Sequence, residues 1–402
     1  MDRRTRGIVT AAFIAQGIAI GSTIGTFSLF VRPVADAFSA TTLEVSIGLS
    51  LMTLMLGVCG VPIGMWLDRG TPRTIMFIGS TLVPAGLLLA SQAESMGELA
   101  IACIVCGAGI PMLGPLTTAA IVGKATVAER GRALGIANLG VAVGAFVFAL
   151  LGGFIMDESG WRAALRVFSG AVFAVGFIAV AIGIPKDLGK EANREADPSD
   201  TGQLVAPKDL FRNPIFLLLA TSLGIAIGTN AGWIAHVASF LTDLGATAKY
   251  AGVMVGASQG SMALGTLALG SLADKYHGTT IISAVFAVQI LCFSVLLTLP
   301  SLPVAGMALV VFGIAAGGFL PVFAHLLAEQ FGARNLGRVM GLSNLFLLPF
   351  GFGLPMIAGA LRDTHGSYLS TLMLCAGLLA TGIVVLTALA REIAASRSAT
   401  QT

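Results

Sequence analysis

The chain has 402 residues, of which 56% are hydrophobic and only 11% are charged, and its mean hydropathy is +0.91. This composition leaves too little polar surface to cover a soluble globule, so it excludes an ordinary soluble domain and indicates a protein that lies in lipid. The formal net charge is only +3, and we expect no nucleic-acid partner.

Apolar runs long enough to cross a bilayer as helices, which takes about 20 residues, recur twelve times along the chain. Helices are the expected form because every backbone polar group in lipid must be bonded within the protein. We therefore predict an all-α membrane protein with twelve transmembrane helices. The predicted spans are residues 7–31, 43–67, 74–92, 97–122, 132–156, 163–184, 214–241, 249–273, 279–299, 302–328, 338–361 and 367–390.

A short charged stretch leaves an apolar run twice, at Gly64–Arg69 and at Gly270–Lys275, with a displacement of 206 residues between Asp68 and Asp274. The same displacement relates Arg132 to Arg338 without a gap. Such an internal repeat predicts two pseudo-symmetric halves, which is typical of transporters. We predict a six-helix half over residues 1–184, a polar cytoplasmic linker over 185–213 and a second six-helix half over 214–402.

Lys and Arg accumulate in short cytoplasmic loops, so their distribution predicts the orientation. With both termini inside, 18 of the 23 cations fall on the cytoplasmic side and five fall outside. The basic N-terminus followed by an apolar run is similar to a signal peptide, but the run is too long and lacks a cleavage pattern, so we interpret it as a retained first helix. Two extracellular turns are expected, at Phe30–Phe38, where Pro33 cannot continue a regular helix, and at Asp157–Arg162, with an interfacial Trp161.

Polar side chains inside the predicted spans are candidates for a solute-binding cavity. The alternative is that Ser and Thr bond backbone carbonyls and that small polar residues join neighbouring helices. His236 is a candidate for protonation during transport, but it could equally bond a carbonyl on a neighbouring helix. The predicted substrate-binding residues are Gln16, Thr23, Thr26, Asn230, Trp233, His236, Gln259 and His325.

Cations also stand where two cytoplasmic helices begin, at Arg132 and Arg338, beside glycines that allow close approach. Charges at helix ends can form ion pairs in one conformation and lose them in the other, so we interpret both as gating residues. The alternative is anchoring by the excess of cations on the inner face.

No enzyme is expected, because every Asp and Glu falls in a tail, a loop or a helix end and no nucleotide-binding or metalloprotease motif occurs. We therefore predict no catalytic residue, no metal and no cofactor. Cys103 and Cys106 share a helical face, but no other ligand type lies near them, and we interpret all five cysteines as small apolar core residues.

The chain resembles the major facilitator superfamily of secondary transporters. The resemblance rests on Gly64–Arg73, Gly270–Gly278, Arg132–Gly135 and Gly160–Arg162. Gly70 stands one place early relative to the family's loop pattern, and only Arg73 follows it. In the family this loop closes the cytoplasmic gate, and the resemblance assigns that role to Asp68, Arg69, Arg73, Asp274 and Lys275.

A looser resemblance links Thr26–Phe38 to the end of helix 1 in monocarboxylate and oxalate/formate porters. Those carriers usually hold the carboxylate with an Arg in helix 8, where this chain has Thr266 or a residue close to it. The helix 11 Lys of oxalate/formate exchangers and the Gly-Pro pattern of drug-proton antiporters are also missing.

Together these observations predict an alternating-access transporter in the inner membrane of a bacterium. The pocket lacks a fixed charge, and an uncompensated charge in a low-dielectric cavity is costly. We therefore expect a small neutral or weakly acidic organic solute, such as a monocarboxylate or an aromatic or lactone catabolite. A proton is the expected coupling ion, carried through His236 or through no titratable protein group. The alternative function is efflux of hydrophobic drugs, and we expect a monomer surrounded by membrane lipid.

Overall fold

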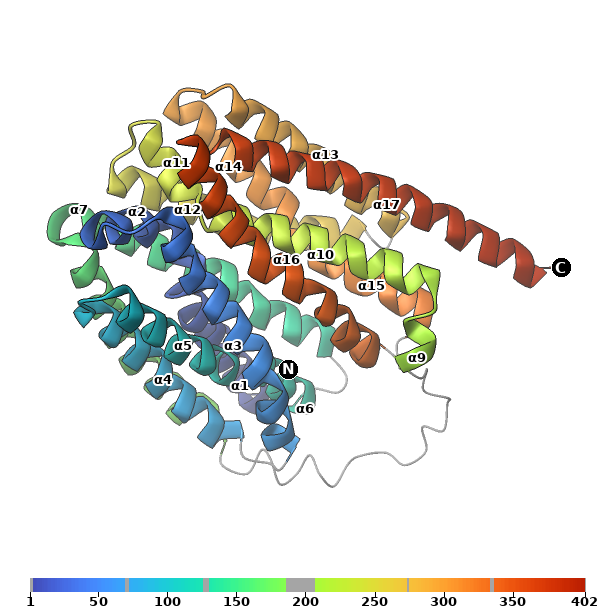
Figure 1. The fold of residues 1–402 in the computed structure, drawn as a ribbon. Coiled ribbons are helices and arrows are strands. Elements are labelled where there is room, and N and C mark those ends of the chain that lie inside the picture. The colour runs from blue at the N-terminus through green and yellow to red at the C-terminus, as the bar shows by residue number, and fades with distance from the viewer. Residues whose placement is uncertain are drawn as a thin grey trace. The chain divides into compact units, whose positions relative to one another are not determined.

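The computed structural model describes residues 3–68, 72–125, 130–185, 207–272, 275–332 and 336–401. Across these ranges the chain is almost entirely helical and has no strand, which confirms the predicted all-α fold (Figure 1). The elements are α1 (Arg3–Gly21), η1 (Ile24–Thr26), α2 (Phe27–Phe38), α3 (Thr42–Asp68), α4 (Pro72–Gln92), α5 (Met96–Leu113), α6 (Pro115–Ala125), α7 (Arg130–Gly183), α9 (Pro207–Leu210), α10 (Pro214–Ile234), α11 (Val237–Asp243), α12 (Ala248–Leu272), α13 (Gly278–Leu297), α14 (Leu302–Gly317), α15 (Phe319–Phe331), α16 (Leu336–His365) and α17 (Leu369–Gln401).

Within the described ranges, nine helices are long and apolar enough to cross a membrane, or ten when the bent pair Arg4–Gly21 and Ile24–Phe38 counts as one span. One of the nine, Arg132–Gly183, has 52 residues and contains two of the predicted spans. The predicted span 338–361 lies in the 30-residue α16, which is not among the nine. Each of the twelve predicted spans thus corresponds to a helix, to part of one or to a pair of helices.

Local sequence signals set where several helices begin. Thr41 and Glu44 form a capping box at the start of α3, in which the Glu44 carboxylate accepts from the Thr41 backbone N–H at 2.8 Å and the Glu44 N–H donates to the Thr41 hydroxyl at 3.2 Å. The Asn213 side chain caps α10, whose first residue is Pro214. These caps satisfy N–H groups that no helical carbonyl can reach.

The helices of the two halves begin at matching positions. The starts of α3 and α12, of α4 and α13, of α5 and α14, and of α7 and α16 are each 206 residues apart. Two left-handed backbone positions repeat with the same displacement, Ser39 with Gly245 and Gly160 with Gly366. The repeat seen in the sequence is therefore a repeat of helix boundaries, as two pseudo-symmetric halves require.

The chain divides into two compact units, Met1–Asp200 with Val237–Gly260 and Thr201–His236 with Ser261–Thr402. Unit 1 therefore contains α1–α7, α11 and the first part of α12, and unit 2 contains α10 and α13–α17 with the rest of α12. The half boundaries at 184 and 214 stay a prediction. Most of the predicted linker lies outside the described residues.

Of the two predicted turns, one is corrected by the structure and the other coincides with a break between two helical segments. Phe30–Phe38 is not a turn but most of α2, and Pro33 lies inside this helix. Proline is tolerated in a membrane helix where neighbouring groups satisfy the freed carbonyl. At the predicted turn Asp157–Arg162 the helix is broken at Gly160, whose φ of 77° glycine adopts readily, so α7 consists of two helical segments that meet at this kink.

Unit 1 is held together where α1 and α7 cross at backbone contact. Gly17 and Gly21 on α1 face Gly140 and Gly144 on α7, and a Cβ added at Gly144 would overlap the backbone of Gly17. This is the small-residue spacing with which membrane helices approach closely without a hydrophobic driving force. Any larger side chain must push the two helices apart.

We expect Gly144→Ala to destabilise the protein by about 1–3 kcal/mol, the usual cost of overpacking. The matched control is Gly170→Ala, also in α7, where an added Cβ meets nothing within 4 Å. Replacing this Gly by Ala favours a helix, so the control should not lower the melting temperature. Thermal unfolding of both purified variants measures the difference, and equal melting temperatures would contradict a close contact between α1 and α7.

Candidate functional site

The first transmembrane segment of unit 1 is interrupted. α1 and α2 are bent by 46° around residues 22–26, where the chain forms the short η1. The Ser22 hydroxyl donates to the Ile18 carbonyl at 2.6 Å, and the Thr23 hydroxyl donates to the Ala19 carbonyl. Because these hydroxyls bond the preceding turn, they favour a bend in the helix at this point.

Polar atoms without a hydrogen-bond partner among the described residues lie on both sides of this interruption. Three side chains have such atoms: the amide nitrogen and oxygen of Gln16 and the hydroxyls of Thr26 and Ser28. All three side chains are at most 1% exposed. A buried polar group without a hydrogen bond lowers the stability of the folded state by about 1–3 kcal/mol. Gln16 and Thr26, both predicted from the sequence, thus have bonding capacity that a solute or water could use.

A second interruption separates α10 from α11, at Ala235 and His236. His236 is fully buried, and its Nε2 lies 3.0 Å from the Pro355 carbonyl of α16. A carbonyl only accepts, so Nε2 carries the hydrogen. Trp233 is also buried and packs edge-on against Phe293, with ring centroids 5.6 Å apart. In unit 2 these two predicted residues are therefore embedded in side-chain and backbone contacts.

The remaining predicted substrate residues lie in different environments. Asn230 is half-buried on α10, and Gln259 is buried on α12. His325 is exposed on α15, so its side chain is outside this buried set. Four of the eight predicted residues therefore lie at or next to the two helix interruptions, Thr23 and Thr26 at one and Trp233 and His236 at the other.

The gating residues are only partly described. The Arg73 guanidinium donates to the Ala181 carbonyl near the end of α7 at 3.0 Å and lies over the Phe77 ring. Arg132 and Lys275 are exposed. Asp68 and Arg338 lie in α3 and α16, with side chains outside the description. Arg69 and Asp274 lie outside the described residues.

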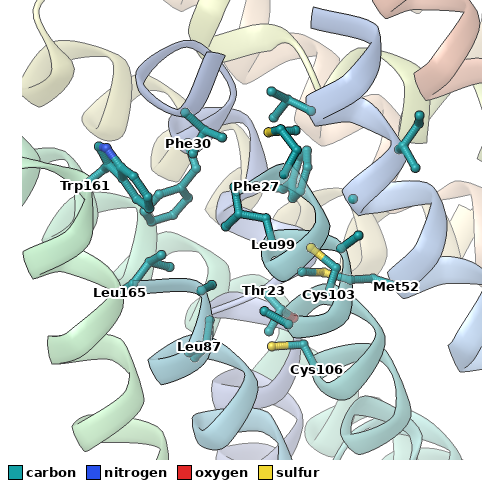
Figure 2. Close-up of a pocket in the computed structure, with 18 of the residues that line it drawn as sticks. Thr23, Phe27, Phe30, Met52, Leu87, Leu99, Cys103, Cys106, Trp161 and Leu165 are labelled. Atoms are coloured by element: carbon teal, nitrogen blue, oxygen red, sulfur yellow. The ribbon is translucent and has the colours of Figure 1, made fainter. Parts of the chain in front are cut away.

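An apolar cavity of about 90 Å³ lies beside the interruption of unit 1. Figure 2 shows Thr23, Cys103 and Cys106 near one end of it and Trp161 with Phe30 near the other. The one carboxylate in its wall, Glu44, is occupied in the capping box of α3. The cavity is smaller than the roughly 150 Å³ that holds benzene in an engineered core, and no Lys or Arg is among the described residues that line it. Cys103 and Cys106 are buried free thiols, as expected for apolar core residues.

Several polar residues were not anticipated. Ser28, Thr229 and Ser239 are buried, and their hydroxyls have no partner within the described ranges. Thr229 could have been found through the repeat, since it follows Thr23 by 206 residues. Arg32 on α2 pairs with Asp243 on α11 at 2.9 Å within unit 1. Two residues 211 positions apart give no local signal of such a pair, and an exposed pair of this kind contributes only about 0–1 kcal/mol.

The sequence is similar to named transporters along most of its length. It is 26% identical over 388 residues to "Monocarboxylate transporter 13" of Bos taurus, covering 94% of this chain and 88% of that protein. It is 22% identical over 374 residues to the "Uncharacterized MFS-type transporter YcxA" of Bacillus subtilis (strain 168), covering 89% and 88%.

The fold is similar to a crystal structure of a bacterial homolog of the human lysosomal transporter Spinster in an inward-facing and occupied conformation. The TM-score is 0.77 at 16% identity, and the match covers 97% of this chain and 98% of that one. The family model "Major Facilitator Superfamily" matches residues 12–351, most of the sequence. The chain is a multi-pass membrane protein and belongs to the major facilitator superfamily of transporters.

Proposed function

We propose that this protein moves a small, weakly acidic or neutral organic solute, of the monocarboxylate or aromatic or lactone type, across a bacterial inner membrane by alternating access. The observation that carries the proposal is the pair of helix interruptions, one in the first span of each half, with buried polar side chains around them. Interrupted helices at midplane depth are where secondary transporters bind their solutes. The proposed topology places both termini in the cytoplasm, and the protein is proposed to act as a monomer in lipid.

The chemistry of the buried polar groups supports a solute without net charge. Gln16, Thr26 and Ser28 offer one amide and two hydroxyls, which can bond a carboxylic acid, an ester or a lactone. None of them carries a charge that could neutralise a carboxylate, and burying a carboxylate unpaired is very costly. A monocarboxylic acid would therefore cross with its own proton. The names of the monocarboxylate transporter relatives support this solute class.

His236 is then a positioning residue, not a proton carrier. Its Nε2–H holds the Pro355 carbonyl, and its ring lies 5.4 Å from that of Tyr368, so it fastens the end of α10 to α16. Both of these contacts lie inside unit 2.

Hydrophobic drug efflux is the second candidate, favoured by the mostly apolar wall of the cavity, which includes Phe27 and Trp161. The two functions differ in which ligands stabilise the native state. In a thermal-shift panel of pyruvate, benzoate, a lactone and hydrophobic drugs, we expect the acids and the lactone to raise the melting temperature. Stabilisation by the drugs alone would support efflux and contradict the proposal.

We expect Gln16→Leu to separate stability from transport. Removing a buried amide that lacks a partner should leave the melting temperature unchanged or raise it, while proton-driven uptake of labelled pyruvate into proteoliposomes should fall at least about 10-fold, the effect of losing roughly 1.4 kcal/mol of binding. Gln92→Leu, an exposed change in α4, is the control and should leave both unchanged. Normal uptake by Gln16→Leu would show that this amide does not contact the solute.

The role of His236 can be tested with two substitutions. In His236→Gln the side-chain amide can still donate to the Pro355 carbonyl, so we expect the pH dependence of uptake to persist. His236→Leu removes the donor from a buried carbonyl and should cost about 1–3 kcal/mol of stability. If His236→Gln is stable but its uptake no longer depends on pH, His236 carries the proton and our assignment is wrong.

A further inference from the structure

The apolar cavity of unit 1 lies against the bend of the first span (Figure 2). Its wall includes Ser22 and Thr23, which lie between α1 and η1, and Phe27, Phe30 and Val34 from α2. The rest of the wall comes from α3, α4, α5 and α7. One cavity therefore contacts the chain on both sides of the bend.

The backbone at the bend is held by long hydrogen bonds. The N–H groups of Ser22, Thr23 and Thr26 each donate to a carbonyl at 3.3 Å. Backbone bonds of this type usually measure about 2.9–3.0 Å and weaken as they lengthen. We therefore expect the amides of the bend to open more easily than those of the regular helices around it.

The bend has no room on the side where it meets α7. A Cβ added at Gly25 would lie 2.9 Å from the Cβ of Ala145, and one added at Gly21 would overlap the backbone of Gly144. Neither Ala145 nor Gly144 lines the cavity. The cavity is thus the side on which the bend has space to change.

The polar groups in the wall of the cavity are already bonded. The hydroxyls of Ser22 and Thr23 donate to carbonyls of α1. The Cys106 thiol donates to the Val83 carbonyl at 3.5 Å, and Glu44 accepts in the capping box of α3. None of the buried polar atoms that lack a partner within the described ranges belongs to this wall. A molecule in the cavity would therefore be held chiefly by dispersion contacts.

We propose that this cavity is a binding site for a small, uncharged, apolar molecule, and that the bound molecule fixes the bend of the first span. At about 90 Å³ the cavity selects molecules smaller than benzene, because the engineered cavity that takes up benzene or xenon measures roughly 150 Å³. The sulfur atoms of Met52, Cys103 and Cys106 and the aromatic rings in the wall are polarisable and favour such contacts. The inference does not depend on which solute the protein transports.

The bound molecule would act by filling the space into which the bend can move. It would contact Thr23 on one side of η1 and Phe27 on the other, so a change in the 46° angle must displace it. A ligand that binds only this conformation lowers the population of opened states by the factor 1 + [L]/Kd. Apolar molecules dissolve in hydrocarbon and reach the wall of the cavity through the bilayer.

The test uses xenon as the probe and the full-length protein in nanodiscs, with helium at the same pressure as the blank. Xenon should raise the melting temperature. Amide hydrogen exchange in residues 18–27 should slow about 3-fold at a xenon concentration near twice the Kd. Exchange in α17, which lies in unit 2, should not change.

Two matched variants on α4 locate the xenon. Leu87 lines the cavity and is 3% exposed, whereas Leu89 is 47% exposed and does not line it. Leu87→Phe places its added atoms in the cavity, so it should keep the melting temperature under helium and lose both effects of xenon. Leu89→Phe is the control and should respond as the unaltered protein does. Cys103→Leu fills the same cavity from α5 and replaces Leu87→Phe if that variant does not fold.

Four results would overturn the inference. The first is an equal response to xenon by Leu87→Phe and the unaltered protein, and the second is that both filling variants unfold. The third is a raised melting temperature with unchanged exchange in residues 18–27, because the bound xenon would then not fix the bend.

The fourth result concerns lipid, since the end of an acyl chain offers the same apolar chemistry. If xenon has no effect and mass spectrometry finds a bound lipid that Leu87→Phe loses, the cavity is a lipid site. Uptake of pyruvate is measured separately, so a failed transport proposal leaves the xenon results unaffected.

Discussion

Hydrocarbon offers no hydrogen bonds to a backbone, and this constraint governs most of the structure. Nearly every described residue is helical because a helix satisfies its own N–H and C=O groups. Departures from helix occur where side chains or glycine compensate for them. Ser22 and Thr23 bond carbonyls of the preceding turn at the bend of the first span, and Gly160 supplies the positive φ at the kink between the two segments of α7. The bend of the first span therefore lies where side-chain hydroxyls bond the backbone of the preceding turn.

Most of the fold was predictable from the sequence, because the length and hydropathy of each apolar run and the 206-residue repeat can be read directly from the order of residues. The repeat held even at helix starts, with Thr42 and Ala248 opening α3 and α12. The predicted turn at Pro33 was wrong because two local tendencies compete there. Pro33 indicates a turn, yet the membrane favours helix, and α2 continues through it. The contact of Gly17 with Gly144 was also hidden, since glycine spacing alone does not say which helices meet.

The candidate site was less predictable, because polarity within a span does not reveal whether a partner is present. Gln16 and His236 were both candidates in the sequence, as polar residues in apolar runs. In the structure the Gln16 amide has no partner among the described residues, whereas His236 bonds the Pro355 carbonyl, 119 positions away. The latter contact depends on how α10 packs against α16, which no local pattern encodes.

The distribution of charge then fits the chemistry of a weak acid. Burying an unpaired anion in an uncharged interior is very costly. Gln16, Thr26 and Ser28 lie buried in unit 1 and carry no charge. A weak acid that crosses with its own proton needs no titratable group in the transport path. The absence of any carboxylate from the middle of the predicted spans would then follow from the solute carrying its own proton.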